Sequence, residues 1–165
     1  GIDYDAKFVF EAVGYNVEGS EIGAAFGLEQ LKKLQKNIVT RKNNFKIQCD
    51  FFNKHKQLFS NPVEKDNINT AWLAFPILIN ENAPFSRKEF QIYLEKRNIQ
   101  TRVVFTGNII RQPMMKDQKY KITEKGYPNS DAVMERGVLL PLHHGLTDEM
   151  FNRLHRTIDE FIESI

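Results

Sequence analysis

The sequence predicts an α+β fold, with a small mixed or antiparallel sheet flanked by helices. Three observations lead to this prediction. The chain has 165 residues, which suits one domain and is too short for two full hydrophobic cores. Hydrophobic residues make up 41% of it and include 13 Phe, enough to build a core. Apolar segments follow in the order helix, strand, helix, strand, loop, helix, strand, helix.

The N-terminal 18 residues show no helical period and are predicted to form an extended arm or loop, with the domain itself at 19–165. Ser20 is expected to cap a helix that starts at Glu21, because a serine hydroxyl accepts backbone hydrogens there. We expect this helix to reach about Lys56 in two pieces. Its predicted apolar stripe consists of Leu31, Leu34, Ile38, Phe45, Cys49 and Phe52.

The first strand is predicted at 71–79. Pro76 within it indicates a sheet edge or a bulge, because proline cannot donate to a ladder. Ser86 and Glu89 have the spacing of a capping box, which predicts a helix from there to about residue 97.

The remaining elements are less regular. A second strand is expected at 99–105, followed at 107–127 by a long, basic loop of the kind that is often functional. A short helix at 130–135 and a third strand at 137–141 come next. A last helix starts at Thr147. The predicted buried face of this helix consists of Met150, Phe151, Leu154, Ile158, Phe161 and Ile162.

Composition excludes several classes of function. The formal net charge of +2 is too close to balance to indicate a nucleic-acid binder. Eight Lys or Arg lie between Lys32 and Lys56, but aromatic residues do not alternate with them, and we interpret this face as solvated. No apolar run is long enough to span a membrane and no secretory signal is visible, so we expect a cytoplasmic protein without a membrane partner. The lone Cys49 excludes an internal disulfide and a multi-cysteine metal site.

Few residues carry obvious chemistry. The sequence has no Gly-rich phosphate loop, no Cys or His ligand cluster and no Gly-x-Ser-x-Gly elbow, and we assign it no catalytic residue and no metal. His143 and His144 are adjacent, so they are expected to point to opposite sides and not to bind one metal. One interpretation is a strand end with one buried and one exposed histidine. The other is a contact between His143 and an anionic or sugar ligand.

The segment 107–113 combines a glycine with two amides and a guanidinium, including Asn108 and Arg111. These groups bind hydroxyls and phosphates without titrating near neutral pH. The alternative is a purely structural loop.

Two stretches near the N-terminus resemble a known family. Residues 4–16, which end in Gly-Tyr-Asn, and residues 20–31, with Ala-Ala, Gly-Leu and Gln-Leu, are similar to the DegT/DnrJ/StrS group of pyridoxal-phosphate (PLP) sugar aminotransferases and dehydratases of fold type I. Arg41 and the pair at 44–45 also fit the family's following helix.

Downstream motifs resemble one branch of this group, the nucleotide-sugar 3-dehydratases. They are Thr-Arg-Val-Val-Phe-Thr-Gly-Asn at 101–108, Arg-Gln-Pro at 111–113, Pro-Asn-Ser-Asp at 128–131 and His-His-Gly-Leu-Thr-Asp-Glu at 143–149. Enzymes of this branch remove the C3 hydroxyl of a CDP- or GDP-linked 4-keto-6-deoxyhexose. The resemblance therefore implies such a nucleotide-linked 4-keto sugar as substrate, in deoxysugar synthesis for polysaccharide or O-antigen.

The resemblance covers only the family's C-terminal part, and the chain starts at Gly1 rather than Met. It implies the C-terminal small domain of a fold-type I enzyme, without the large domain that holds the Schiff-base lysine or its histidine replacement. The parent is then a homodimer using PLP or its amine form PMP. We expect neither bound cofactor nor turnover in this chain alone. The alternatives are a sugar-nucleotide aminotransferase of the same family and a non-catalytic binding module.

The resemblance also implies roles for single residues. Asn16 would bind the cofactor phosphate across the dimer, and Phe8 and Phe10 would lie near the sugar. The family's aminotransferases often carry a basic residue where this chain has Glu18, and the lone cysteine cannot build the iron–sulfur cluster of one dehydratase type. The further substrate-contact residues are Arg102, Asn108, Arg111 and His143.

Overall fold

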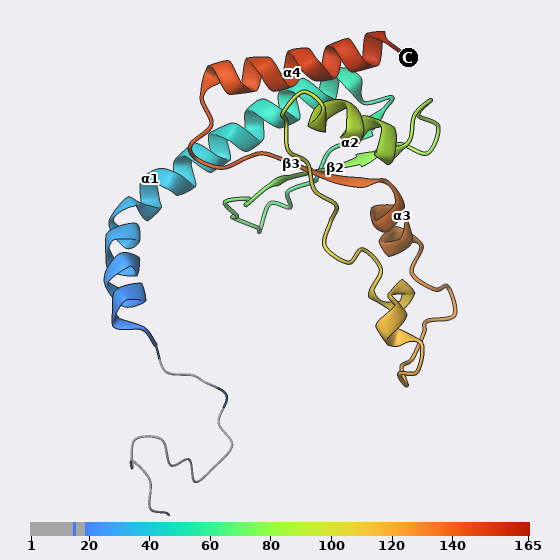
Figure 1. Cartoon of the computed structure of the whole chain (residues 1–165), viewed down its shortest axis with the longest axis horizontal. Helices are drawn as coiled ribbons and strands as arrows, with labels where there is room; N and C mark the ends of the chain where they lie inside the picture. The colour runs from blue at the N-terminus through green and yellow to red at the C-terminus, as the bar shows by residue number, and fades with distance from the viewer. Residues whose placement is uncertain (1–14, 16–18) are drawn as a thin grey trace, which may run out of the picture. The chain divides into compact units, whose positions relative to one another are not determined.

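The computed structural model describes Tyr15 and residues 19–165 (Figure 1). The predicted arm lies outside the described residues except for Tyr15. The chain divides into two compact units, residues 1–35 and 36–165. Helix α1 (Glu21–Phe52) runs through the boundary without interruption, so the expectation of two helical pieces is wrong. No proline lies between its ends to break its hydrogen bonds.

The part of α1 in the first unit starts as predicted, because the Ser20 hydroxyl accepts the Gly23 backbone N–H at 3.4 Å. Its apolar side chains, however, are exposed. Leu31 and Leu34, which were expected in a buried stripe, expose 63% and 48% of their surface. The buried part of the stripe begins only at Phe45.

The second unit holds an antiparallel sheet in the order β1-β2-β3. Its strands are β1 (Phe59–Ser60), β2 (Phe75–Ile79) and β3 (Gly137–Leu140). The helices of this unit besides α1 are α2 (Arg87–Glu95), α3 (Pro128–Arg136) and α4 (Asp148–Glu163). The α+β prediction of a small antiparallel sheet with helices is confirmed for the described residues.

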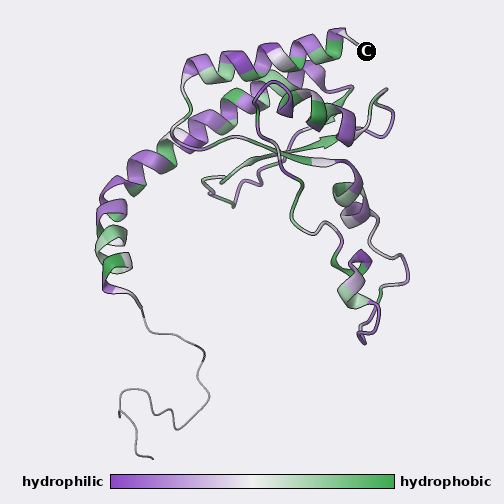
Figure 2. Ribbon diagram, in the orientation of Figure 1, coloured by the Kyte–Doolittle hydropathy of each residue, from purple (hydrophilic) through white to green (hydrophobic). Residues whose placement is uncertain are grey.

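The core lies between the sheet and the helices. Alternate residues of β2 are fully buried, as the two-residue period of a strand requires. In Figure 1, α4 runs beside the C-terminal part of α1, and Figure 2 shows hydrophobic colour along β2 and β3 and in patches on α4. The largest buried side chains include Phe52, Phe59, Phe75, Phe90, Leu94, Leu140 and Ile158.

Capping residues in the sequence correctly predicted where α2 and α4 begin. Ser86 and Glu89 form the predicted capping box, with Glu89 N–H donating to Ser86 Oγ at 3.2 Å and Ser86 N–H to Glu89 Oε2 at 2.7 Å. The Thr147 hydroxyl caps α4 by accepting the Met150 N–H at 3.3 Å. The predicted buried face of α4 is correct except at Met150, which is 52% exposed, and Ile162, which is only partly buried.

The expectation that Pro76 marks a sheet edge or a bulge is wrong, because Pro76 lies in the central strand β2 and in unbroken register with β3. Leu139 exchanges both backbone hydrogen bonds with Arg102 at 2.7 and 3.1 Å, so its partner Pro76 points its ring nitrogen away from β3. On that side β1 pairs only with Ile79 and Leu78. The missing N–H of Pro76 therefore leaves no gap in the ladder.

The expected strand at 99–105 is wrong. Only the bridge between Arg102 and Leu139 forms there, because Phe105 (φ +45°) and Gly107 (φ +61°) turn the chain away from β3. The first strand is also shorter than predicted, starting at Phe75. The loop at 107–127 is present and contains two short 3-10 turns, Ile109–Arg111 and Pro113–Met115. Among the described helices, none is both long and apolar enough to cross a membrane.

Candidate functional site

The structure places four of the predicted contact residues in two separate groups. Arg102 and His143 line one cavity. Asn108 and Arg111 meet at the carboxylate of Asp131. The remaining three predicted residues, Phe8, Phe10 and Asn16, lie outside the described residues.

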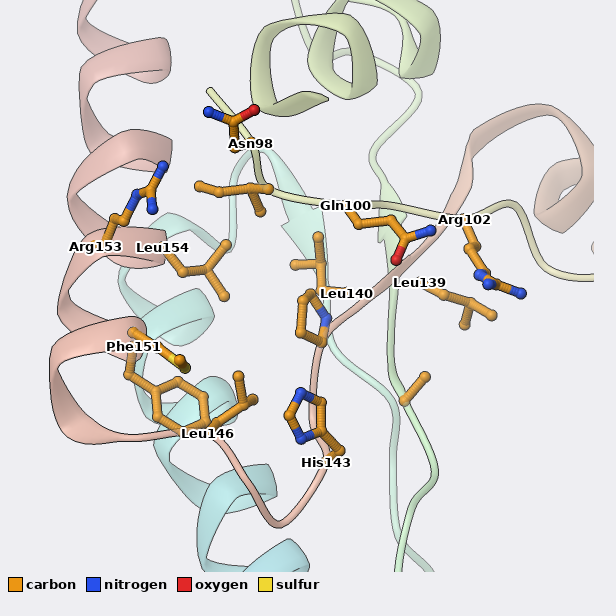
Figure 3. A pocket seen from close by; sticks show the side chains of 14 residues that line it. Asn98, Gln100, Arg102, Leu139, Leu140, His143, Leu146, Phe151, Arg153 and Leu154 are labelled. Carbon is orange, nitrogen blue, oxygen red and sulfur yellow. The ribbon is translucent and has the colours of Figure 1, made fainter. Parts of the chain in front are cut away.

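The cavity has a volume of about 430 Å³ and lies between the 98–102 segment, the end of β3 and the first turns of α4. Apolar side chains form most of its wall, while polar groups stand around it (Figure 3). This is the usual composition of a small-molecule site. Its polar or charged lining residues are Asn98, Gln100, Arg102, His143 and Arg153.

His143 and His144 follow β3 in a turn, and both are exposed. The expectation of one buried and one exposed histidine is therefore wrong, because the strand ends at Leu140, before either residue. The His143 Nδ1 accepts the Gly145 N–H at 3.1 Å. In the neutral ring the proton then sits on Nε2, which makes that nitrogen the donor available to a ligand.

Arg102 and Arg153 bring positive charge to the cavity. The Arg102 backbone is fixed by its two hydrogen bonds to Leu139, and its side chain extends from the 98–102 segment (Figure 3). Arg153 Nη2 donates to the Arg97 carbonyl at 2.6 Å, which ties α4 to the chain just after α2. The cavity thus combines an apolar wall with guanidinium and imidazole donors, a set suited to a hydroxylated, anionic molecule.

Asp131 of α3 anchors the second group. Asn108 is buried, and its Nδ2 donates to Asp131 Oδ1 at 2.7 Å while its own Oδ1 accepts the Ile110 N–H at 3.3 Å. The Asn108 amide is thus engaged in holding the loop. Arg111 binds Asp131 in bidentate fashion, Nε to Oδ1 at 3.0 Å and Nη2 to Oδ2 at 2.9 Å.

These bonds have an electrostatic consequence. Hydrogen bonds from Arg111 and Asn108 lower the pKa of Asp131 to about 2, and the same bond raises the pKa of Arg111. The Arg111 side chain remains 60% exposed. Its outward N–H groups can therefore still contact a phosphate.

Sequence reasoning missed several neighbours of these residues. No role was predicted for Asp131, because an acid 20 residues from an arginine gives no local sign of pairing. Gln100 and Arg153 also escaped notice, because their place at the cavity depends on packing between distant segments. The hydrophobic periodicity of a sequence gives no information about contacts between distant segments.

The described residues offer little catalytic equipment. They contain no cluster of His, Cys, Asp or Glu that could hold a metal ion. Burial raises the pKa of the Cys49 thiol to about 11, with Asp50 and Glu64 adding to the shift, so Cys49 is not a thiolate nucleophile near neutral pH. No lysine lines the cavity. The cavity does offer imidazole, guanidinium and amide groups that can bind and orient a ligand.

Comparison with known proteins agrees with this geometry. Residues 1–159 match the model of the DegT/DnrJ/EryC1/StrS aminotransferase family. The chain is 33% identical over 159 residues to a dTDP-4-dehydro-2,6-dideoxy-D-glucose 3-dehydratase of Saccharopolyspora spinosa, covering 96% of this chain and 34% of that protein. It is 29% identical over 158 residues to the lipopolysaccharide biosynthesis protein RfbH of Salmonella typhimurium, covering 96% of this chain and 36% of the other.

A solved structure shows the same fold. The E. coli GDP-4-keto-6-deoxy-D-mannose-3-dehydratase with bound hydrated PLP aligns with a TM-score of 0.76 and 26% identity, over 92% of this chain and 38% of that one. The chain spans about a third of the length of the curated relatives that it matches.

Proposed function

Because the chain belongs to the DegT/DnrJ/EryC1/StrS aminotransferase family, we propose that it is the C-terminal small domain of a PLP- or PMP-dependent nucleotide-sugar enzyme. The proposed reaction is loss of the C3 hydroxyl from an NDP-4-keto-6-deoxyhexose in deoxysugar biosynthesis. The observation that carries it is the match to a sugar 3-dehydratase along nearly the whole chain.

The described residues contribute binding groups to this reaction. In our proposal, Arg102 and Arg111 face the diphosphate of the nucleotide sugar, and the His143 Nε2–H donates to a sugar hydroxyl. In this proposal these donors bind and orient the substrate, and other groups of the enzyme carry the proton transfer. Asn108 supports Arg111 through Asp131, so its role is indirect.

The cofactor supplies an electron sink that weakens bonds next to the sugar carbonyl. The described lining of the cavity supplies no lysine, so a covalent link to PLP would have to come from another part of the enzyme. We propose that another part of the enzyme holds PLP or PMP, and that the Asn16 amide contacts its phosphate from the neighbouring subunit of a homodimer. Phe8 and Phe10 would lie near the sugar. The isolated chain is then inert.

Exposed apolar residues support a larger assembly. Ile22, Phe26 and Leu28 on the first turns of α1 expose 84%, 66% and 63% of their surface. A helix with apolar residues around much of its circumference is typically buried. We propose that the rest of a cytoplasmic enzyme covers them.

The test uses the full-length enzyme with PMP and a CDP- or GDP-linked 4-keto-6-deoxyhexose. We expect loss of the C3 hydroxyl, whereas amino-acid-dependent amination at C4 would identify the aminotransferase alternative. Absence of both reactions would contradict the enzymatic proposal and favour a binding module.

A pair of variants tests the site. His143→Ala should raise KM for the nucleotide sugar by about tenfold, the effect of losing one hydrogen bond of about 1.4 kcal/mol. His144→Ala, which removes the neighbouring exposed histidine, should leave KM unchanged. Equal effects of the two variants would contradict a specific role for His143.

A further inference from the structure

Two side-chain amides one turn apart on α1 face the segment that carries His143. Asn44 and Gln48 expose only 5% and 0% of their surface, on the part of the helix that also buries Phe45, Phe51 and Phe52. A buried amide costs free energy unless each polar atom is satisfied. Their presence on a core-facing helix surface therefore requires partners, and the structure shows which ones.

The partners are three successive backbone carbonyls just after β3. Gln48 Nε2 donates to the Pro141 carbonyl at 3.2 Å. Asn44 Nδ2 donates to the His143 carbonyl at 3.0 Å and lies 3.5 Å from the Leu142 carbonyl. The sheet ladder ends at Leu140, so these carbonyls have no strand to pair with. The two amides of α1 take the place of that strand.

The orientation of the Gln48 amide is itself fixed. His155 of α4 bonds the Gln48 Oε1 through Nε2 at 2.9 Å, and its ring stacks on Phe51 at 3.9 Å between centroids. Because burial keeps His155 neutral, Nε2–H is the donor and Gln48 Oε1 the acceptor. The NH₂ group of Gln48 then faces Pro141.

We infer that Asn44 and Gln48 are positioning residues for His143. They fix the backbone at 141–143 and thereby hold the imidazole at the cavity with Nε2–H as its outward donor. The His143 carbonyl also accepts the Leu146 N–H at 3.2 Å, so the Asn44 amide stabilises the turn whose Gly145 N–H bonds His143 Nδ1. The consequence for substrate binding, though not the positioning itself, rests on the proposed function.

The first test measures the His143 ring without any ligand. In ¹⁵N NMR of the full 165-residue chain labelled at histidine, we expect His143 to show one neutral tautomer, protonated at Nε2. Asn44→Leu and Gln48→Met keep side-chain volume but remove the donors. We expect both to give a mixture of tautomers at His143 and at least tenfold faster amide exchange at Gly145 and Leu146.

A matched control separates positioning from general destabilisation. Thr157→Val removes an equally buried polar group whose hydroxyl bonds only the Arg153 carbonyl of its own helix, at 2.8 Å. It should leave the His143 tautomer unchanged. Should Asn44→Leu fail to fold, the smaller Asn44→Ala, which also lacks the donor, is measured instead. A single unchanged tautomer in both the Asn44 and the Gln48 variants would overturn the inference.

The second test concerns substrate binding in the full-length enzyme. Asn44→Ala should raise KM with little change in kcat, and it should add less than twofold to the effect of His143→Ala, because both act through the same imidazole. Full additivity in this double-variant cycle would overturn the link between Asn44 and His143. If the enzyme proves not to bind nucleotide sugars, the ligand-free NMR result still decides the positioning role.

Discussion

The imidazole of His155 on α4 lies parallel to the phenyl ring of Phe51 on α1, with 3.9 Å between ring centroids and 1° between ring planes. The pKa of His155 is lowered from 6.5 to about 4, mainly by burial; Asp159 opposes this shift, and the charges of Lys54 and His55 add to it. In the folded chain the ring therefore stays neutral under mildly acidic conditions. In the unfolded chain it takes up a proton near its ordinary pKa.

This relationship predicts acid sensitivity. The folded pKa lies below the unfolded one, so stability is fully present above about pH 6.5 and falls as the pH is lowered to about 4. The slope for one proton is at most about 1.4 kcal/mol per pH unit. Urea unfolding at a series of pH values measures it. His155→Gln should flatten the curve in this window, whereas the exposed His144→Gln should not. Equal slopes in all three proteins would contradict the prediction.

In the folded chain, the Asp131 carboxylate should titrate with a midpoint of about 2. Carboxyl ¹³C NMR measures this titration. Because this pKa lies below the ordinary value of 3.8, the ion pair with Arg111 stabilises the fold above that pH and is lost as the pH falls through about 2. Arg111→Gln should move the midpoint upward. Lys116→Gln removes a charge from the same loop without a bond to Asp131 and is the control. A midpoint that stays at about 2 without Arg111 would exclude the guanidinium as the cause.

Gly107 should tolerate no side chain. It has a φ of +61°, and a Cβ added there would lie 2.4 Å from the Met134 Cβ and 2.7 Å from its Cα. Gly107→Ala should therefore lower the free energy of unfolding by about 2–4 kcal/mol, from backbone strain plus the clash with α3. Gly126→Ala, at φ +63° with open space around it, should lose only about 1 kcal/mol. Urea unfolding compares the two, and similar losses would show that Met134 moves aside.

Replacing Phe105 should raise the free energy of unfolding. It has a φ of +45° and its side chain is 87% exposed, so its backbone is strained while it buries little apolar surface. Asparagine adopts this conformation more readily, and Phe105→Asn should raise the free energy of unfolding by about 1 kcal/mol. Ile122→Asn, a similar change at an exposed residue without positive φ, should give no gain. A loss of stability in Phe105→Asn would contradict this explanation.

Elements with local signals could be predicted from the sequence. The capping box of Ser86 and Glu89 and the Thr147 cap depend on residues three positions apart, and both helices start where expected. The strand at 137–140 was visible as a short apolar run after a helix. These features need only the energetics of neighbouring residues.

Other features depend on distant partners. The strand expected at 99–105 fails because Phe105, a residue type that rarely takes positive φ, turns the chain. The apolar stripe of α1 was correct at Phe45 and Phe52 but not at Leu31, since burial depends on what lies opposite.

The candidate site shows the same division. The residue types at Arg102, Asn108, Arg111 and His143 indicated polar contacts, but the sequence could not separate them into two groups. Arg102 and His143 line the same cavity because the 98–102 segment lies beside β3, and Asn108 meets Arg111 because both bond Asp131 of α3. No role was predicted for the amides of Asn44 and Gln48, and only their partners explain why they are buried.

The short ladder between β1 and β2 has a consequence for self-association. Phe59 pairs with Ile79 and Ser60 with Leu78, and continuing this register would place Pro62 opposite Pro76. Neither proline has an N–H to donate, so the chain cannot lengthen the ladder there. For the same reason a strand from another molecule finds no regular row of donors along this part of β2. Pro76 thus disfavours the pairing of a strand from another molecule with this part of β2.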